Sequence, residues 1–194
     1  FAGEQPKIIS NMREVNARTI ALVDDLFDVA KIEEGHFDYK FKNDNILNVV
    51  EKVFEEYKPQ AEARGISFVF EKENIPEFSF DEHKMRLVVK NVVDNAIFYT
   101  KESGNVELRT KNEGGFAIIS IKDNGIGIPE DQHDRIFSKL FRAPNALKIR
   151  PDGSGLGLFI AKSIVESHGG TVELKTEENK GTEVVIKLPL RHTK

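Results

Sequence analysis

The sequence of 194 residues contains no cysteine and no tryptophan. Without cysteine, disulfide bonds, thiolate nucleophiles and cysteine-ligated zinc are excluded. No run of residues approaches the roughly 20 apolar positions that span a bilayer. No secretory leader is visible either. We therefore expect no membrane contact from this chain. We expect it to be cytoplasmic, whether or not the parent protein is membrane-anchored. The net charge of −4 gives no reason to expect nucleic-acid binding.

What is present is the composition of a folded protein, with 39% hydrophobic and 31% charged residues. The length allows one compact domain plus a substantial extension. Because Phe1 is not an initiator methionine, we expect the chain to be a piece of a longer protein.

The first segment has a heptad pattern that predicts one long helix from Ile8 to Glu34, ended by Gly35 in a left-handed cap. Its apolar seam consists of Ile8, Met12, Val15, Thr19, Leu22, Leu26 and Val29. So wide an apolar stripe needs partner helices. We expect residues 1–35 to be half of a helical hairpin that forms a homodimeric bundle. The alternative is that the helix packs on its own domain.

Residues 36–194 mix helical and strand patterns, which predicts an α+β domain. Helices are expected at 45–64, 81–99 and 156–167. Strands are expected at 37–42, 66–71, 106–111, 116–122, 172–176 and 182–188, with 76–80 extended. Two hairpins join neighbouring strands, the first across a turn at 112–115. The pattern favours a two-layer sandwich, a mixed sheet covered on one face by helices. A long irregular stretch occupies 123–153.

Two asparagines form the first candidate cluster. Asn91 and Asn95 are four residues apart, so both amides project from one face of the expected helix. An amide oxygen is a hard ligand that suits magnesium. Alone, such a pair is most often ordinary surface polarity, so the pair gains weight only from its neighbours.

A carboxylate at a strand end forms the second cluster, Asp123 followed by Gly125, Gly127 and Ile128. The carboxylate can accept a hydrogen bond from an exocyclic amine such as that of adenine. The glycines would let the backbone approach a flat ring closely. By itself the segment also fits a plain turn.

Cationic side chains gather in the third cluster, which includes Phe141 and Arg142. Five cations and no acidic residue occur between positions 135 and 150, namely Arg135, Lys139, Arg142, Lys148 and Arg150. Such a patch in an acidic protein suits a polyphosphate. The alternative is a solvated loop.

Glycines open a helix in the fourth cluster, which comprises Gly153, Ser154, Gly155, Leu156, Gly157 and Leu158. Backbone amides at a helix start form an anion site. The spacing matches neither the dinucleotide fingerprint nor a Walker loop.

In this order, the four clusters resemble the N, G1, F and G2 boxes of the sensor histidine kinases of two-component signal transduction. These belong to the Bergerat-fold ATPases, shared with gyrase, MutL and heat-shock-90 chaperones. His168, Gly169 and Gly170 resemble the histidine-kinase branch. The segment that ends at Gly35 is similar to the second helix of the family's dimerisation and phosphotransfer hairpin.

The resemblance implies a role for each matching residue in binding ATP and Mg²⁺. Asn95 would bind the metal and Asn91 would lie beside the phosphates. Asp123 would take the adenine amine. The remaining nucleotide contacts would come from Tyr99, Gly125, Gly127, Ile128, Phe141, Arg142, Gly153, Ser154, Gly155, Leu156, Gly157, Leu158 and Thr182.

Two features depart from the family's pattern. Phe98 stands where the N box commonly has a phosphate-facing lysine. We therefore expect weaker ATP affinity, or compensation by Lys101 or by a cation of the third cluster, which would form a lid over the site. The acceptor histidine is also missing, since none precedes Gly35. We interpret His36 as a surface residue and His168 as structural. His83, His133 and His192 have no supporting context.

We therefore expect the ATP-binding core of a sensor histidine kinase. It would donate the γ-phosphoryl group to a histidine outside this chain, and thence to an aspartate of a response regulator. No catalytic residue is assigned within the chain. One alternative is a catalytically silent regulatory or dimerisation module. Another is an ATP-driven conformational ATPase, against which Lys90 counts because it stands where that branch has a glutamate base.

Overall fold

The structure is a computed structural model that describes residues 5–191. Phe1 and His192 lie outside the described residues, as does the side chain of Ile8. The chain divides into two compact units, residues 1–37 and 38–194. No helix in the described part is both long and apolar enough to cross a membrane.

The first unit consists of the helix α1 (Gln5–Glu33), which confirms the predicted long helix. Its end is a Schellman motif: Gly35 has φ +68°, its N–H donates to the Ile32 carbonyl, and the His36 N–H donates to the Lys31 carbonyl. Glycine adopts this left-handed conformation without the steric cost that a Cβ adds, so the helix stops there.

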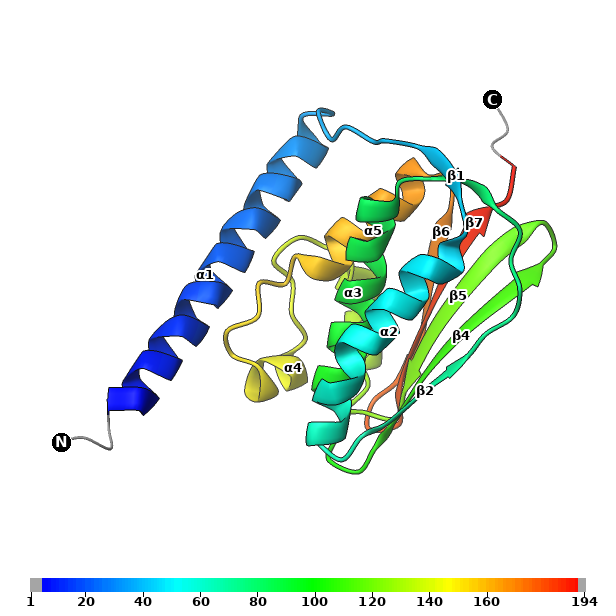
Figure 1. Cartoon of the computed structure of the whole chain (residues 1–194). Coiled ribbons are helices and arrows are strands. Elements are labelled where there is room, and N and C mark those ends of the chain that lie inside the picture. Colours follow the sequence, from blue (N-terminus) through cyan, green and yellow to red (C-terminus); the bar gives the residue numbers. More distant parts are fainter. Residues whose placement is uncertain (1–4, 192–194) are drawn as a thin grey trace. The chain divides into compact units, whose positions relative to one another are not determined.

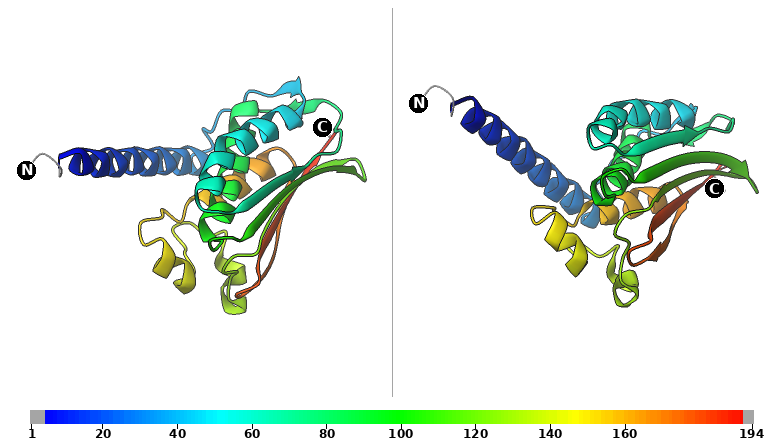
Figure 2. Two further views of the ribbon diagram at one scale, coloured as in Figure 1. Left: turned by 60° about the horizontal axis from the view of Figure 1, so that its bottom comes forward. Right: turned by 90° about the horizontal axis from the view of Figure 1, so that it is seen from below.

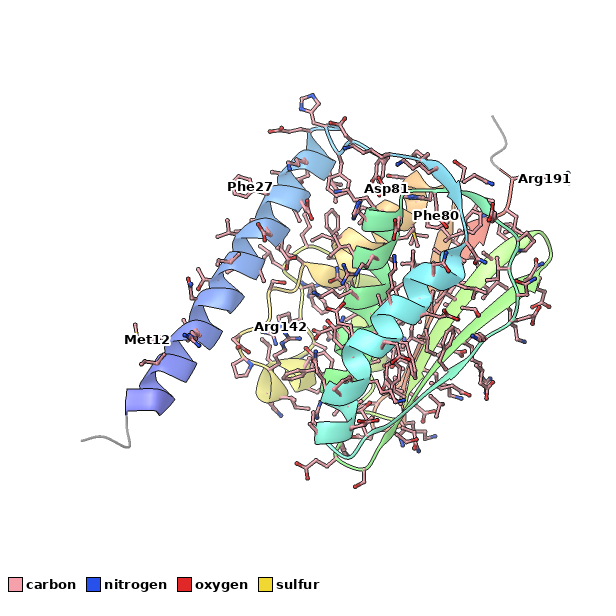
Figure 3. The ribbon with its side chains drawn as sticks, viewed as in Figure 1. Met12, Phe27, Phe80, Asp81, Arg142 and Arg191 are labelled. Atoms are coloured by element: carbon pink, nitrogen blue, oxygen red, sulfur yellow. The ribbon has the colours of Figure 1, made fainter. Side chains whose placement is uncertain are left out.

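The predicted seam of α1 is exposed over much of its length. Met12, Val15 and Leu26 are 66%, 61% and 49% exposed. Met12 and Phe27 project from the same side of the helix (Figure 3). Apolar side chains exposed in a continuous row on one helix are typical of an interaction surface.

The second unit contains a five-stranded mixed sheet in the order β2-β4-β5-β7-β6. Its strands are β2 (Ser67–Glu71), β4 (Asn105–Glu113), β5 (Phe116–Asp123), β6 (Thr171–Glu177) and β7 (Gly181–Pro189). Only β2 and β4 pair in parallel; the other neighbours are antiparallel. Two short strands, β1 (Lys42–Asp44) and β3 (Phe78–Phe80), pair separately.

Three helices, α2 (Ile46–Ala63), α3 (Glu82–Tyr99) and α5 (Gly157–Ser167), cover one face of this sheet (Figures 1 and 2). The core lies between the two layers, where Leu108, Ile119 and Met85 are fully buried. Alternate strand residues point to this core and to solvent, as the period of two requires. The predicted α+β sandwich is confirmed.

The helix starts were predictable because their caps are local. Asn45 Oδ1 accepts from the Leu47 N–H at 3.0 Å, and Asp81 Oδ1 accepts from the Lys84 N–H at 3.0 Å. At the predicted hairpin turn, Gly114 and Gly115 both have positive φ. Two such residues match the twist of the flanking strands.

The predicted strand at 37–42 is wrong for residues 37–41, since β1 begins only at Lys42. The alternation there has another cause. The Lys40 N–H donates to Asp81 Oδ2 at 2.6 Å, and the rings of Tyr39 and Phe41 both lie on the His168 ring, at 5.4 and 4.8 Å between centroids. Alternate residues of the segment therefore contact α3 and α5 without joining a sheet.

His168 holds this junction together, which confirms its structural interpretation. It is 2% exposed, its Nε2 accepts from the Asp81 N–H at 3.0 Å, and its Nδ1 donates to the Ile164 carbonyl at 2.8 Å. One imidazole therefore joins the end of α5 to the start of α3.

Replacing His168 with Ala is expected to destabilise the domain by about 2–4 kcal/mol, because it leaves a cavity and an unpaired buried N–H. Urea denaturation measures the change. His36→Ala is the control, since the His36 side chain is 79% exposed and its loss should cost under about 0.5 kcal/mol. Equal stability of the two variants would overturn the assignment.

The stretch 123–153 is mostly irregular, as expected, but contains two short helices. These are the 3₁₀ helix η1 (Glu130–Arg135) and the helix α4 (Pro144–Ile149). We call residues 135–152 the lid.

Candidate functional site

Asp123, the last residue of β5, is the buried carboxylate of the candidate site. Its Oδ1 accepts from the N–H of Gly125 at 2.8 Å and from the N–H of Thr182 at 3.2 Å. No described residue donates a hydrogen bond to Oδ2. One oxygen therefore anchors the loop, and the other remains available to a donor from a ligand.

Burial raises the pKa of Asp123 to about 6, because removing the carboxylate from water disfavours its charged form. The two backbone N–H groups act in the opposite direction and offset only part of this effect. A carboxylate that is costly to ionise, without a neighbouring cation, is typical of a functional position.

The glycines after Asp123 allow the backbone to pass very close to neighbouring chain. A Cβ on Gly125 would lie 2.4 Å from the Tyr99 carbonyl oxygen, and one on Gly127 would lie 1.9 Å from the Glu177 carbonyl oxygen. Gly127 also has φ +58°. The loop is thereby fixed between the end of α3 and the turn joining β6 to β7.

Threonine side chains complete this end of the site. Thr176 Oγ1 accepts from the Ile128 N–H at 3.0 Å, donates to the Gly181 carbonyl at 3.0 Å, and lies 3.0 Å from Thr182 Oγ1. Thr182 was among the predicted residues and lies beside Asp123. Thr176 was missed, since one threonine in a strand gives no signal of its own.

Helix α3 connects the carboxylate end of the site to the fourth cluster, residues 153–158, which we call the glycine loop. Asn91 Nδ2 donates to the Gly157 carbonyl at 3.1 Å, and the Tyr99 carbonyl accepts from the Ile126 N–H at 3.2 Å. Asn95 lies between these contacts, half-buried, and its amide makes no hydrogen bond with any residue that the structure describes. An amide oxygen so placed fits a ligand that arrives from outside the chain.

The glycine loop packs against the lid. A Cβ on Gly155 would lie 2.9 Å from the Phe141 carbonyl oxygen and 3.0 Å from Arg142 Cγ. Ser154 Oγ accepts from the Leu156 N–H at 3.2 Å. Helix α5 then begins at Gly157 without a side-chain cap, so its first N–H groups are not satisfied by a capping side chain. Leu156 is buried and Leu158 half-buried.

Arg142, a lid residue, packs against the glycine loop, and one of its guanidinium nitrogens is unpaired. Its Nη1 donates to the Pro151 carbonyl at 2.8 Å, and its guanidinium carbon would be 3.1 Å from a Cβ on Gly153. Nη2 is buried and has no hydrogen-bond partner among the described residues. A buried, unpaired guanidinium nitrogen is costly unless an anion reaches it. Figure 3 labels this side chain within the lid.

Phe141 is half-buried and stacks under the Arg135 guanidinium, 4.6 Å from the ring centroid. Two further pairs join the lid to α5, with Lys139 over Phe159 at 5.5 Å and Lys162 over Phe137 at 5.3 Å. Cation–aromatic contacts of this kind contribute about 0.5–1 kcal/mol each at exposed sites. The lid is therefore held on α5 by several weak contacts.

Contacts that the sequence did not predict attach the lid to the other side of the site. Asn145 Nδ2 donates to the Gly127 carbonyl at 2.9 Å, and Arg150 Nη1 donates to Asp94 Oδ2 at 2.8 Å. Burial alone would lower the pKa of Arg150, but the hydrogen bond and charge of Asp94 outweigh it and raise the pKa. In the sequence, Arg150 was noticeable only as one of the five cations between positions 135 and 150.

The structure thus brings all four predicted clusters together around α3, and the match to known families identifies the class. Residues 80–192 match the family described as histidine kinase-, DNA gyrase B-, and HSP90-like ATPase. The chain belongs to this family. Because the matched residues include Asp123, the glycine loop and the lid, the class of site is that of an ATP-binding domain.

Sequence relatives specify the branch. The chain is 31% identical over 175 residues to histidine kinase P4 of Formosa agariphila, covering 88% of this chain and 13% of that protein. It is 32% identical over 168 residues to the sensor protein SrrB of Staphylococcus aureus, covering 87% of this chain and 29% of SrrB. It therefore spans less than a third of the length of either relative.

Solved structures agree. Full-length ShkA, crystallised in complex with AMPPNP, has 26% identity and a TM-score of 0.82, over 98% of this chain and 40% of that one. The catalytic domain of histidine kinase ThkA has 27% identity and a TM-score of 0.68, over 78% of this chain and 98% of that one. The expected histidine-kinase type of ATP-binding catalytic domain is confirmed.

Proposed function

We propose that this chain binds Mg-ATP and donates its γ-phosphoryl group to a histidine outside the chain. The observation that carries the nucleotide assignment is Asp123, a buried carboxylate whose Oδ1 is held by two backbone N–H groups and whose Oδ2 has no described donor. An exocyclic amine of adenine would donate to Oδ2. Gly125, Gly127 and Ile128 would then border the base.

The phosphates would lie beside the middle of α3, against residues 153–158 and Arg142, because Asn91, halfway along α3, contacts Gly157. The unpaired Nη2 of Arg142 supports this placement, since it would gain a charge-assisted hydrogen bond from a phosphate oxygen. The N–H groups at the start of α5 would add to it. Negative charge developing on the transferred group would be stabilised by the same donors.

Magnesium would be held by Asn95, whose half-buried amide has no described partner within the chain. When bound there, Mg²⁺ would neutralise part of the phosphate charge. Among the described residues no group of three acidic or histidine side chains could hold the ion alone. A single protein ligand, Asn95, is compatible with Mg²⁺ because this ion is commonly held by substrate phosphates as well as by the protein.

In the parent protein, we propose that α1 pairs with other helices in a homodimeric bundle and that the domain is cytoplasmic. The exposed seam of Met12, Val15 and Leu26 supports the pairing. The onward acceptor would be an aspartate of a response regulator. ThkA, solved in complex with the response regulator protein TrrA, shares this fold at a TM-score of 0.73 and 24% identity, over 98% of this chain and 52% of that one.

The test uses ATP labelled on its γ-phosphate, with the chain alone and with a separate helical hairpin that carries an acceptor histidine. We expect Mg-dependent ATP binding, no label on the chain, and label on the hairpin. The matched control is the same hairpin with its histidine replaced by glutamine. Absence of binding would favour the silent module, steady-state hydrolysis would favour the ATP-driven switch, and label on the chain itself would refute an external acceptor.

A further inference from the structure

Phe98, which stands where the family commonly has a lysine, has two guanidinium groups over its ring. The guanidinium carbon of Arg150 is 4.5 Å from the ring centroid, and that of Arg64 is 5.8 Å from it. The two arginines differ in what they bind. Arg64 donates to the carbonyls of Ile97, Phe98 and Thr100, which caps the end of α3. Arg150 comes from the lid and makes no such cap.

Arg150 is held in this position from two sides. Asp94, the neighbour of Asn95 in sequence, accepts its Nη1 hydrogen bond at 2.8 Å, while Phe98 supplies the ring face. Its side chain is still 30% exposed. Arginine stacks on aromatic rings and keeps its remaining donors free, so a guanidinium so held can still bind an anion.

The lid backbone ties this guanidinium to Arg142. Arg142 donates to the carbonyl of Pro151, the residue directly after Arg150, and its own Nη2 is unpaired. The lid therefore supplies one cation, Arg142, beside residues 153–158 and a second, Arg150, beside Asp94 and Phe98 of α3. Asp94 and Phe98 lie on either side of Asn95 in the sequence, the residue to which the metal and its phosphates are assigned.

We infer that Arg150, positioned by Phe98 and Asp94, supplies the phosphate-facing charge that a lysine at position 98 would otherwise supply. The inference rests on the proposed function. It moves this cation from the rigid helix α3 to the lid, so phosphate binding and lid position become coupled. It also explains why an uncharged aromatic residue stands at position 98, since a lysine there would repel Arg150.

The test measures Mg-ATP affinity by calorimetry and adenosine affinity by NMR titration in three variants. Arg150→Gln keeps most of the side chain and removes the charge. It should weaken Mg-ATP binding by about tenfold or more, the worth of one charge-assisted hydrogen bond, and change adenosine binding less than about twofold. The double variant F98K/R150Q should recover Mg-ATP affinity to within about threefold of the unmodified chain, because a cation returns to the site.

The control is Lys58→Ala, which removes a cation stacked on a phenylalanine, Phe54, at 5.9 Å on helix α2. Its Mg-ATP affinity should not change. An equal loss of ATP and adenosine affinity in Arg150→Gln would show that Arg150 only holds the lid in place, and would overturn the inference. Failure of F98K/R150Q to recover affinity would overturn it too. If the unmodified chain bound neither ligand, the proposed function itself would fail.

Discussion

Replacing Asp123 with Asn is expected to weaken nucleotide binding by about 10–100-fold, the worth of one hydrogen bond to a charged group. The same substitution should leave the domain as stable as before, or more stable. Both backbone hydrogen bonds to residue 123 end on Oδ1, which an asparagine retains. Only the charge and the acceptor at Oδ2 are lost.

The stability effect has a defined pH dependence. Burial raises the pKa of Asp123 from 3.8 to about 6, so the folded state holds the proton more tightly than the unfolded state. Stability from this residue is therefore greatest below pH 3.8 and falls as the pH rises to about 6. The two-unit rise corresponds to about 3 kcal/mol at most, of which we expect Asp123→Asn to recover about 1–2 kcal/mol at pH 8.

Urea denaturation at pH 4 and pH 8, with calorimetric titration of Mg-ATP, measures both effects. The two proteins should be equally stable at pH 4 and diverge above it. In the unmodified chain, Mg-ATP affinity should decrease below about pH 6 as the carboxylate is protonated. Asp38→Asn, at an exposed carboxylate, is the control and should change neither quantity. Destabilisation of Asp123→Asn at pH 8 would show that its charge supports the fold.

The position of Asp123 could be predicted from the sequence, whereas the free-energy cost of ionising its side chain could not. The residue lies where a strand ends and two glycines follow, which is local information. The cost of ionising it depends on Thr182 and on burial by segments far along the chain. Most helix starts and the hairpin turn were predicted for the same local reason, since caps and turns lie within a few residues of what they satisfy.

The errors and omissions have the reverse cause. Alternating aromatics at 37–41 predict a strand, but Asp81 and His168, both distant in sequence, determine how that segment packs. Likewise the hydrogen bonds of Asn145 and Arg150 join the lid to segments 18 and 56 residues away. Such contacts determine the position of the lid. They cannot be predicted from the residue pattern of the lid alone.

Gly127 and Gly114 share a left-handed backbone conformation but differ in what surrounds them. Gly127 has φ +58° and Gly114 has φ +63°, so an alanine at either would bear the cost of a left-handed residue, about 1–2 kcal/mol. A Cβ on Gly114 meets nothing within 4 Å, whereas one on Gly127 lies 1.9 Å from the Glu177 carbonyl oxygen. The difference between Gly127→Ala and Gly114→Ala therefore isolates the clash.

We expect Gly127→Ala to be at least about 2 kcal/mol less stable than Gly114→Ala in urea denaturation, since backbone must move to admit the methyl group. Mg-ATP affinity should also be lost only in Gly127→Ala. The clash would separate the loop from residues 177–179, where the Asn179 N–H donates to the Ile126 carbonyl at 2.7 Å. That separation would displace Ile128 and the loop anchored on Asp123. Equal stability and equal affinity of the two variants would mean that the close approach at Gly127 does not shape the site.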